Sequence, residues 1–370
     1  DNHRKEGGKV ISSSQETALW EIDRLVGQSI MRKAGIPTIP SKEFTDYDTA
    51  IAHVKKTGKR YVSKPTGGIE TNKALSYVSS SADDMVFMLQ RWKKLDKLKT
   101  PFVLQDFVHG IEMGVAGWFG PGGWNEGWEE NFEHKALMND NKGPSTGEQG
   151  TVLRYVRSSK LARKMLSPLT QTLEKVGYVG DIDVNCIIDE KGQAWPLEFT
   201  CRLGWPAFHL QTALIAGDVA EFLLDLANGR DARPFAYDQI AAGVVMSIPD
   251  YPYSKYTRRE ITGIPIYGLK GALWKHTHLC EVAMMEAPIT IDGAMITSPH
   301  PVTAGDYVLV MTAVADTVKD AALTAYRRLA KLKVPAGAMY RTDIGKRLAK
   351  QLPILQKHGY SLGMDYSRES

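Results

Sequence analysis

The sequence predicts an α+β protein, in which helices and strands are mixed along the chain. Two stretches carry apolar residues at helical spacing, and short apolar or alternating runs typical of strands lie between them. Near residue 235 the chain changes to mostly strand-like pieces, which predicts a domain boundary there. At 370 residues the chain is long enough for two or three domains with cores of their own. We therefore expect a larger first part and a smaller mixed C-terminal domain.

Two helices are predicted from the spacing of apolar residues. Positions i, i+3, i+4 and i+7 of the first are Met85, Met88, Leu89 and Trp92. The second stripe consists of Leu161, Met165, Leu169, Leu173 and Val176. Pro168 interrupts it, because proline lacks the backbone N–H that a helix interior uses. Both stripes are most simply helix faces that pack on a core.

Strands are predicted around these helices, over residues 60–64, 101–107, 112–119, 181–188 and 194–201. Residues 228–235, "NGRDARPF", are rich in turn formers and charge, as a linker would be. Beyond them we expect strands over residues 241–248 and 306–315. A helix should begin at Thr317, where Thr317 to Asp320 resembles a capping box.

Composition excludes several classes of function. The net charge of +4 is small and the basic residues are scattered, so no nucleic-acid partner is expected. No run of about 18 apolar residues occurs and the chain starts with polar residues, so neither a membrane span nor a secretory signal is expected. The three cysteines lack metal-ligand spacing, which predicts buried thiols in a reducing compartment, the cytoplasm.

A predicted hairpin over residues 181–202, "DIDVNCIIDEKGQAWPLEFTCR", carries an unusual polar face. Because side chains alternate along a strand, Glu198, Thr200 and Arg202 should share one face of its second strand. A turn at Glu190-Lys191 places Asp183 opposite Glu198, and a turn at Lys191-Gly192 places it opposite Thr200. In either register Asp183, Asn185, Glu198 and Thr200 stay on one face.

This polar face predicts a divalent cation. Carboxylates about 5 Å apart on facing strands repel each other unless a positive charge lies between them. The expected oxygen ligands are Asp183, Glu198 and Thr200, and such ligands suit Mg²⁺ or Mn²⁺, which leave other positions to water and phosphate. The alternative is an edge hairpin whose polar face is in contact with water.

Three further stretches suit a nucleotide or a phosphorylated substrate. "RYVSKPTGG" leads Lys64 into a glycine loop, with Lys73 beyond it, although a lysine before a turn is more often surface decoration. "LQDFVHGIE" (104–112) ends a strand with polar residues that could hold an adenine edge and a ribose, or could be a plain hairpin. The glycine-rich loop 133–151 could wrap a substrate or serve as a connector.

The order of these stretches resembles the ATP-grasp enzymes, and within them the phosphoribosylamine–glycine ligase family. "HKALMNDNKGPSTGEQG" (134–150) looks like that family's substrate loop, and "LEFTCRLGWP" (197–206) is similar to its Glu-Phe-Asn-Cys-Arg-Phe-Gly-Asp-Pro. Residues 241–265 and "TDIGKRL" (342–348) resemble its C-terminal domain. The resemblance runs from about residue 16 to 348.

The resemblance implies a domain plan. It predicts an N-terminal helical or linker segment over residues 1–35 and an ATP-grasp domain over 36–234. Two α+β subdomains, 36–107 and 108–234, would grip ATP, and a C-terminal ligase-type domain would follow over 235–370. The family's leading nucleotide-fold domain is expected to be absent.

The resemblance also implies ligation of an amino acid to an amine through an acyl phosphate, with ATP and Mg²⁺ or Mn²⁺. Arg202 and Lys135 would be catalytic; Glu198, Thr200 and Asp183 would bind metal. The small-molecule substrates, including phosphoribosylamine, would contact Ser145, Thr146 and Gly147. The predicted nucleotide-binding residues are Lys64, Lys73, Gln105, Asp106, Phe107 and Glu112. No membrane or nucleic-acid partner is expected, and a monomer and a homodimer both stay open.

Several positions depart from the family pattern. Its metal-binding Asn is Thr200 here, and Trp205 and Ala207 replace two acids near the amino-acid site. Glu148 and Gln149 replace a Gly-Met pair, and an early family lysine aligns with Arg24. Three interpretations therefore remain: a phosphoribosylamine–glycine ligase, an ATP-grasp ligase with another acid or amine, or a nonenzymatic descendant.

Overall fold

The computed structural model describes residues 1–66, 76–95, 101–230, 235–253, 259–291, 293–335 and 337–368. The chain divides into two compact units. The first unit contains Asp1–Asn125, Lys160–Arg202 and Leu226–Asp231, and the second contains Glu126–Ser159, Leu203–Asp225 and Ala232–Ser370. The domain boundaries expected from the sequence stay a prediction.

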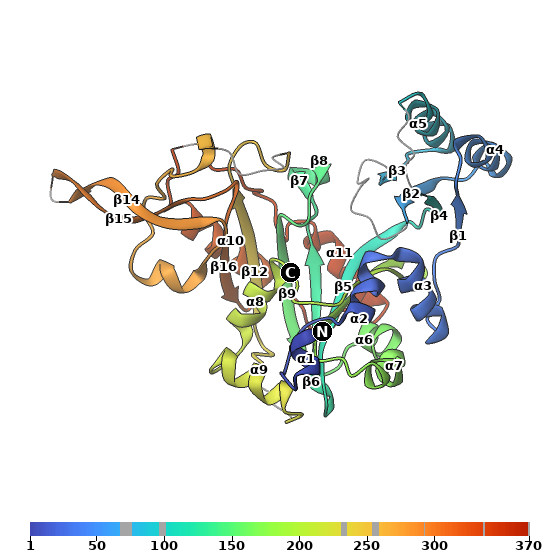
Figure 1. The fold of residues 1–370 in the computed structure, drawn as a ribbon, viewed down its shortest axis with the longest axis horizontal. Helices are drawn as coiled ribbons and strands as arrows, with labels where there is room; N and C mark the ends of the chain where they lie inside the picture. The colour runs from blue at the N-terminus through green and yellow to red at the C-terminus, as the bar shows by residue number, and fades with distance from the viewer. Residues whose placement is uncertain are drawn as a thin grey trace. The chain divides into compact units, whose positions relative to one another are not determined.

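The first unit contains a four-stranded antiparallel sheet covered by two helices (Figure 1). Its strands lie in the order β1 (Ser41–Phe44), β4 (Phe102–Asp106), β2 (Tyr61–Pro65) and β3 (Tyr77–Val78). The helices are α4 (Tyr47–Thr57) and α5 (Ala82–Lys94). Met85, Leu89 and Trp92 are buried in the core that α4 and α5 form with the sheet, so the first predicted helix is confirmed.

A second group of strands in the first unit lies in the order β11 (Ala194–Thr200), β10 (Gly180–Asp189) and β5 (Gly110–Gly120), all antiparallel. The neighbouring helices are α1 (Asn2–Lys5), α2 (Gln15–Ile22), α3 (Arg24–Lys33), α6 (Lys160–Met165) and α7 (Thr170–Lys175). A 3₁₀ turn, Ser167–Leu169, separates α6 from α7 at Pro168, where the sequence predicted an interruption.

The hairpin of β10 and β11 corrects the predicted turn. Its loop has three residues, 190–192, with the Asp189 N–H donating to Gln193 O and Gly192 at a positive φ of 75°. A bulge between Asn185 and Cys186 then shifts the register, so that Asp183 faces Thr200 and Asn185 faces Glu198. Both two-residue turns were wrong, but the pairing of Asp183 with Thr200 that the second one implied is confirmed, and so is the shared face. β11 ends at Thr200, so Arg202 lies beyond the strand.

The second unit contains a row of hydrogen-bonded strands. Their order is β6 (Gly123–Glu133), β9 (Gly150–Val156), β12 (Ile240–Ser247), β16 (Tyr307–Ala315) and β13 (Thr277–Leu279). The part of β6 from residue 126 onward belongs to this unit. Helices α8 (Ala207–Leu214) and α10 (Val318–Leu329) pack on β12 and β16. Gly243 lets α8 approach, because a Cβ there would lie 2.4 Å from Leu210 Cδ1. α10 begins as predicted, since the Asp320 N–H donates to Thr317 Oγ1.

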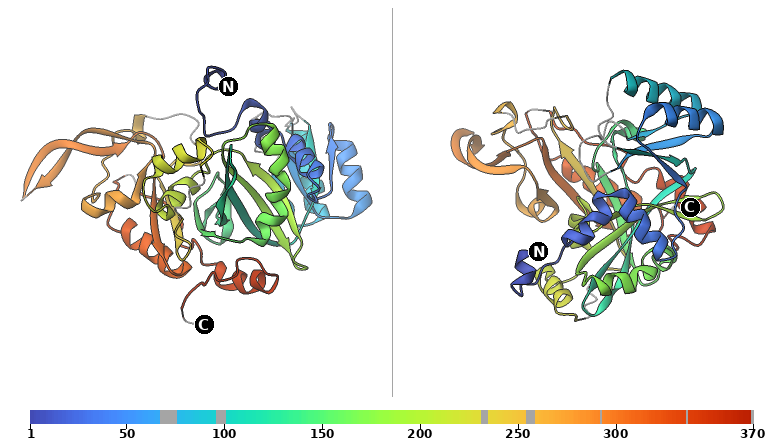
Figure 2. Two further views of the ribbon diagram at one scale, coloured as in Figure 1. Left: turned by 90° about the horizontal axis from the view of Figure 1, so that it is seen from below. Right: turned by 45° about the vertical axis from the view of Figure 1, so that its right-hand side comes forward.

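The second unit also contains two separate hairpins. β14 (Val282–Ile291) and β15 (Ala294–Thr303) form a long ribbon that extends away from the rest of this unit (Figure 2). β7 (Ala136–Met138) and β8 (Lys142–Ser145) form a short one around the 3₁₀ turn Asn139–Asn141. The remaining elements are α9 (Val219–Ala227), α11 (Leu348–Lys357) and the 3₁₀ turns Arg259–Ile261 and Gly271–His276.

The segment after α11 packs into the second unit. Tyr360 and Met364 are fully buried, and Leu362 O accepts a hydrogen bond of 2.8 Å from Nη2 of the buried Arg154. The backbone N–H of Val318 donates to Asp365 O, so this segment also contacts the start of α10. Tyr360 and Met364 are therefore part of the core of this unit.

The three cysteines, Cys186, Cys201 and Cys280, are free thiols. Burial raises the pKa of Cys186 well above its ordinary value and that of Cys280 to about 12, so neither is a ready thiolate. Within the residues that the structure describes, no helix has the length and apolar character needed to cross a bilayer.

Candidate functional site

The predicted nucleotide residues of β2 and β4 lie on two faces of the four-stranded sheet. Lys64 is opposite Val103 and Gln105 is opposite Val62, so Lys64 and Gln105 share one face. This is the face away from α4 and α5, because the alternate residues, including Leu104, belong to the core beneath those helices. Gln105 is buried. One strand pair thus presents a cation and an amide on the same side.

Asp106 and Phe107 have different surroundings. Asp106 is opposite Tyr61, on the other side of β4, and its Oδ2 lies 2.8 Å from Lys59 Nζ. The guanidinium of Arg60 lies over the Phe107 ring, 3.4 Å from its centroid. The other predicted residue, Lys73, lies outside the described residues.

The face of β5, β10 and β11 gathers the predicted metal ligands. Asp183 lies opposite Thr200 on β11 and Ala116 on β5, whereas Asn185 lies opposite Glu198 and Gly114. The same register places Glu112 on this face, since it is opposite Ile187. Asp183 and Asn185 are buried, and the Glu198 side chain is 41% exposed. Small residues on β5 leave this polar row without bulky neighbours on that side.

Two charged residues of the N-terminal helices flank this row. Arg24 Nη2 lies 3.3 Å from Glu198 Oε2, and its Nη1 donates to Leu197 O. Glu21 Oε1 lies 2.7 Å from Arg202 Nη2, and its Oε2 accepts from the Cys201 N–H. A pocket is lined by Glu21, Arg24 and Glu198 together with apolar residues. Glu21 was missed by the sequence reasoning, which offered no local signal for a partner about 180 residues away.

The donor set of this face fits magnesium. In the described part of the chain, no group of three or more His, Cys, Asp or Glu side chains is arranged to hold a metal ion. Mg²⁺ commonly takes only one or two protein carboxylates and completes its shell with water and substrate phosphates. Asp183 and Glu198 supply two carboxylates and Thr200 a hydroxyl on one side of the hairpin. These oxygen ligands match that preference.

The other predicted residues belong to the second unit, in the loop that links β6 to β9. Lys135 Nζ lies 3.1 Å from Glu133 Oε2. Lys135 O accepts two hydrogen bonds of 2.8 Å from Thr146, one from its N–H and one from its Oγ1. Ser145 pairs with Ala136, and a Cβ added at the exposed Gly147 would meet nothing within 4 Å. The loop therefore has a fixed base and open space beside Gly147.

Aromatic residues surround the position where Trp205 replaces an acid. The Trp205 ring lies edge-on to His209, with centroids 4.6 Å apart, and 6.2 Å from the Tyr307 ring. Tyr251 lies edge-on to Tyr307, and its hydroxyl accepts from Gln149 Nε2 at 3.3 Å. Two positions that depart from the family pattern, Trp205 and Gln149, thus contact one aromatic cluster.

Comparisons with known proteins agree along most of the chain. The family model described as "Phosphoribosylglycinamide synthetase, ATP-grasp (A) domain" matches residues 24–207, and the one for the C domain of the same synthetase matches residues 241–347. A phosphoribosylamine–glycine ligase of Ralstonia nicotianae is 27% identical over 363 residues, covering 95% of this chain and 81% of the relative. One of Neisseria meningitidis is 24% identical, covering 94% and 80%.

Solved structures agree in fold. A phosphoribosylamine–glycine ligase of Thermotoga maritima superposes with a TM-score of 0.70 at 22% identity, covering 90% of this chain and 81% of that one. The biotin carboxylase domain of a Hydrogenobacter thermophilus 2-oxoglutarate carboxylase, solved with MgADP and bicarbonate, superposes at 0.57 with 14% identity, covering 96% and 74%. At these identities the likeness is one of fold.

Proposed function

The chain belongs to the phosphoribosylglycinamide synthetase family, and we propose from this that it joins glycine to phosphoribosylamine with ATP and Mg²⁺. Both family models match, in order, across residues 24–207 and 241–347. The ATP-grasp fold expected from the sequence is confirmed, and the protein is an ATP-dependent ligase that forms a C–N bond. The observation that carries the proposal is the row of oxygen ligands, Asp183, Glu198 and Thr200, on one hairpin face of such a chain.

The reaction has two steps. The glycine carboxylate attacks the γ-phosphorus of ATP, which releases ADP and forms glycyl phosphate. The amine then attacks the acyl carbon and releases inorganic phosphate, and its proton passes to solvent or a base. Because both steps concentrate negative charge on phosphate oxygens, catalysis depends on cations and on positioning.

This chain's residues would supply those charges. Asp183, Glu198 and Thr200 would hold Mg²⁺, which neutralises charge on the β- and γ-phosphates when bound. Lys64 would bind the α- and β-phosphates, with Gln105 on the same face of the sheet. Arg202 would bind the phosphoryl group in transfer, and Glu21 orients its guanidinium from 2.7 Å.

The loop of the second unit would bind substrate. Lys135 carries a half-buried ammonium group, and Ser145, Thr146 and Gly147 offer hydroxyls and backbone N–H groups to a carboxylate or phosphate. Glu112 would hold the nucleotide ribose. Asp106 contacts Lys59 and Phe107 contacts Arg60, so Asp106 and Phe107 would support the nucleotide site from the end of β4.

The proposal extends to the metal ion, the cellular compartment and the oligomeric state. Mn²⁺ accepts the same oxygen ligands as Mg²⁺ and would replace it. Free thiols, of which Cys186 and Cys201 are buried and Cys280 is partly buried, suit the reducing cytoplasm. A monomer and a homodimer are both compatible with this chemistry.

A second candidate function is ligation of a different acid or amine. The aromatic cluster around Trp205, His209 and Tyr307 favours it, because these rings offer an apolar, flat surface rather than the acids of the family pattern. Such a surface would contact a substrate larger than glycine.

ADP release tests both candidates. It is measured with Mg²⁺ and ATP in four mixtures: neither substrate, glycine alone, phosphoribosylamine alone, and both. We expect release that requires both. Release that needs other acid–amine pairs would support the second candidate, and no release with any pair would support a nonenzymatic descendant.

A further inference from the structure

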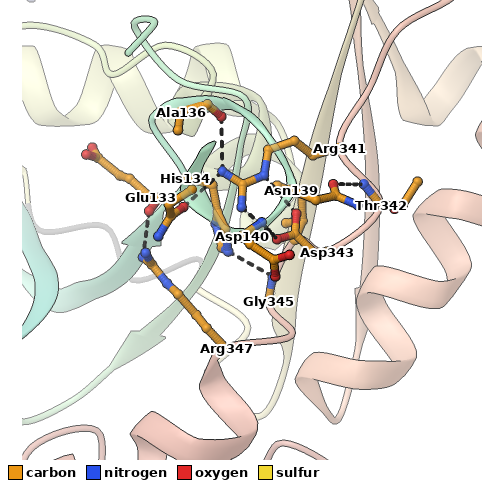
Figure 3. Close-up of polar contacts among 12 residues, drawn as sticks. Glu133, His134, Ala136, Asn139, Asp140, Arg341, Thr342, Asp343, Gly345 and Arg347 are labelled. Carbon is orange, nitrogen blue, oxygen red and sulfur yellow. Dashed lines mark hydrogen bonds and ion pairs between the residues drawn. The ribbon is translucent and has the colours of Figure 1, made fainter. Parts of the chain in front are cut away.

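A buried arginine joins two distant parts of the second unit. Residues 341–347, which we call the C-terminal clamp, lie against the start of the loop that carries Lys135 (Figure 3). Arg341 is 2% exposed, and its Nε and Nη2 donate to the two oxygens of Asp343 at 2.8 Å each. Its Nη1 donates to Ala136 O and to Asn141 Oδ1, both at 3.0 Å. One guanidinium thus binds the clamp to the loop.

Further contacts connect the same loop to the two residues that follow Arg341. Asn139 forms a double contact with Thr342, since its Nδ2 donates to Thr342 Oγ1 at 2.7 Å and its Oδ1 accepts from the Thr342 N–H. The Asp140 N–H donates to Asp343 Oδ2 at 2.9 Å. Although burial opposes it, the hydrogen bond from Arg341 lowers the pKa of Asp343, so this carboxylate stays charged at neutral pH.

The clamp also contacts the two residues that precede Lys135 in the sequence. His134 is buried, and its Nε2 accepts from the Gly345 N–H at 3.2 Å, so its proton is on Nδ1. Burial, with the charges of Arg347 and Arg341, lowers the pKa of His134 well below its usual range, which keeps the ring neutral. Arg347 Nη2 donates to Glu133 O at 2.6 Å.

The clamp also contacts the left-handed backbone of this turn. Asp140 and Asn141 have φ angles of 58° and 55°, in the left-handed region that Asp and Asn adopt more readily than other non-glycine residues. Such conformations persist when neighbouring contacts over-determine them. Here Asp343 binds the Asp140 N–H and Arg341 binds the Asn141 side chain. The clamp therefore holds in place a turn of two left-handed residues, Asp140 and Asn141.

Lys135 lies between the clamped positions. Glu133, His134 and Ala136 each accept from the clamp, and Lys135 O accepts twice from Thr146. The main chain is thus fixed on both sides of Lys135, while 28% of its side chain is exposed. This is the arrangement expected for a rigid support beneath a reactive ammonium group.

We propose that Arg341 and Asn139 are positioning residues, through which the C-terminal clamp sets the placement of Lys135 and Thr146 for catalysis. The inference rests on the proposed function, because it takes Lys135 and Thr146 to contact substrate. It assigns to residues 341–347 an effect on the chemical step, exerted from about 200 residues along the chain.

Two variants test it by steady-state kinetics. Arg341→Lys removes the fork that binds Asp343, Ala136 and Asn141 together; Asn139→Ala removes only an exposed contact and should fold in any case. We expect kcat to fall on the order of 100-fold in Arg341→Lys and about tenfold in Asn139→Ala, because small misplacements of catalytic groups carry such costs. The KM for ATP should stay within about twofold of the parent value in both variants. Arg327→Lys, at an exposed position on α10, is the matched control.

A second measurement needs no turnover. Hydrogen exchange at the Asp140 amide and acylation of Lys135, both read by mass spectrometry, should accelerate in both variants but not in the control. If ADP release fails while these rates respond, the proposed function is wrong and the clamp stands. Unchanged exchange and acylation, or a kcat loss accompanied by an equal loss of ATP affinity, would overturn the positioning role.

Discussion

Glu198, a proposed metal ligand, forms an ion pair with Arg24. The guanidinium lies 3.3 Å from the carboxylate, and both side chains are partly exposed. A surface pair of this kind contributes little to stability, about 0–1 kcal/mol, but it fixes the orientation of the acid. Glu198 therefore contributes little to folding through this pair, and metal binding stays its proposed role.

Replacing Glu198 by glutamine tests this explanation. Glu198→Gln keeps the size of the side chain but removes the charge that would hold Mg²⁺. We expect ADP formation to fall by at least about 100-fold, as when a preorganised charge contact is removed from a transition state. The free energy of unfolding, measured with urea, should change by less than about 1 kcal/mol.

A matched control for that change is Glu190→Gln. Glu190 lies in the turn of the same hairpin, is exposed, and pairs with His109 at 3.2 Å. Its replacement should leave turnover intact. Full turnover in Glu198→Gln would reject the metal role.

At the scale of single residues, the sequence predicted what local alternation determines and missed what distant contacts determine. Asp183, Glu198 and Thr200 were placed on one face because a strand has a period of two. Arg341 could not be found in this way, since its partners Ala136 and Asn141 are about 200 residues away. Whether the predicted residues bind ATP and metal stays a prediction.

Among the elements, the helices with the most regular apolar spacing were predictable, whereas α3, α4, α8, α9 and α11 were not predicted. Met85, Leu89 and Trp92 define α5, and Pro168 marks the break between α6 and α7. The hairpin turn was not predictable, because the three-residue loop depends on Gly192 adopting a positive φ and the register depends on a bulge at Leu197 of β11. The bulge restored the register of the polar face.

The packing of α8 against β13 predicts a pH dependence of stability. His278 on β13 stacks on His209 of α8 with ring centroids 4.5 Å apart, and its Nε2 lies 3.0 Å from Thr312 Oγ1. Burial, followed by the nearby His209 and His276, lowers the pKa of His278 to about 4. The folded protein therefore keeps this ring neutral at pH values where the unfolded chain binds a proton.

The sign follows from linkage. Between about pH 6.5 and 4 the unfolded state binds more protons, so the free energy of unfolding should fall as the pH decreases through this window. Urea unfolding at pH 7.5 and 5 measures the loss. It should be smaller in His278→Gln, whereas His3→Gln, at an exposed position, should behave like the parent. An identical loss in His278→Gln would show that other groups cause it.

For the whole molecule, ligand binding should raise thermal stability. A ligand that binds only the folded state at 100 times its Kd adds about 2.7 kcal/mol to the free energy of unfolding. We expect ATP with Mg²⁺ to raise the Tm and EDTA to reverse most of the increase. Lys64→Ala should reduce the increase by weakening contact with the phosphates. Lys93→Ala, which removes a surface pair with Asp48, should not.

The burial of Tyr360, Ser361 and Met364 has a practical consequence for handling this protein. Proteolytic trimming after α11 would uncover Arg154 and its partner Glu130, which are 7% and 3% exposed. Water would then reach an ion pair inside the strand layer, and fragments shortened in this way would be poor material for crystallisation or assays. Expression designs should retain these residues and keep affinity tags clear of them.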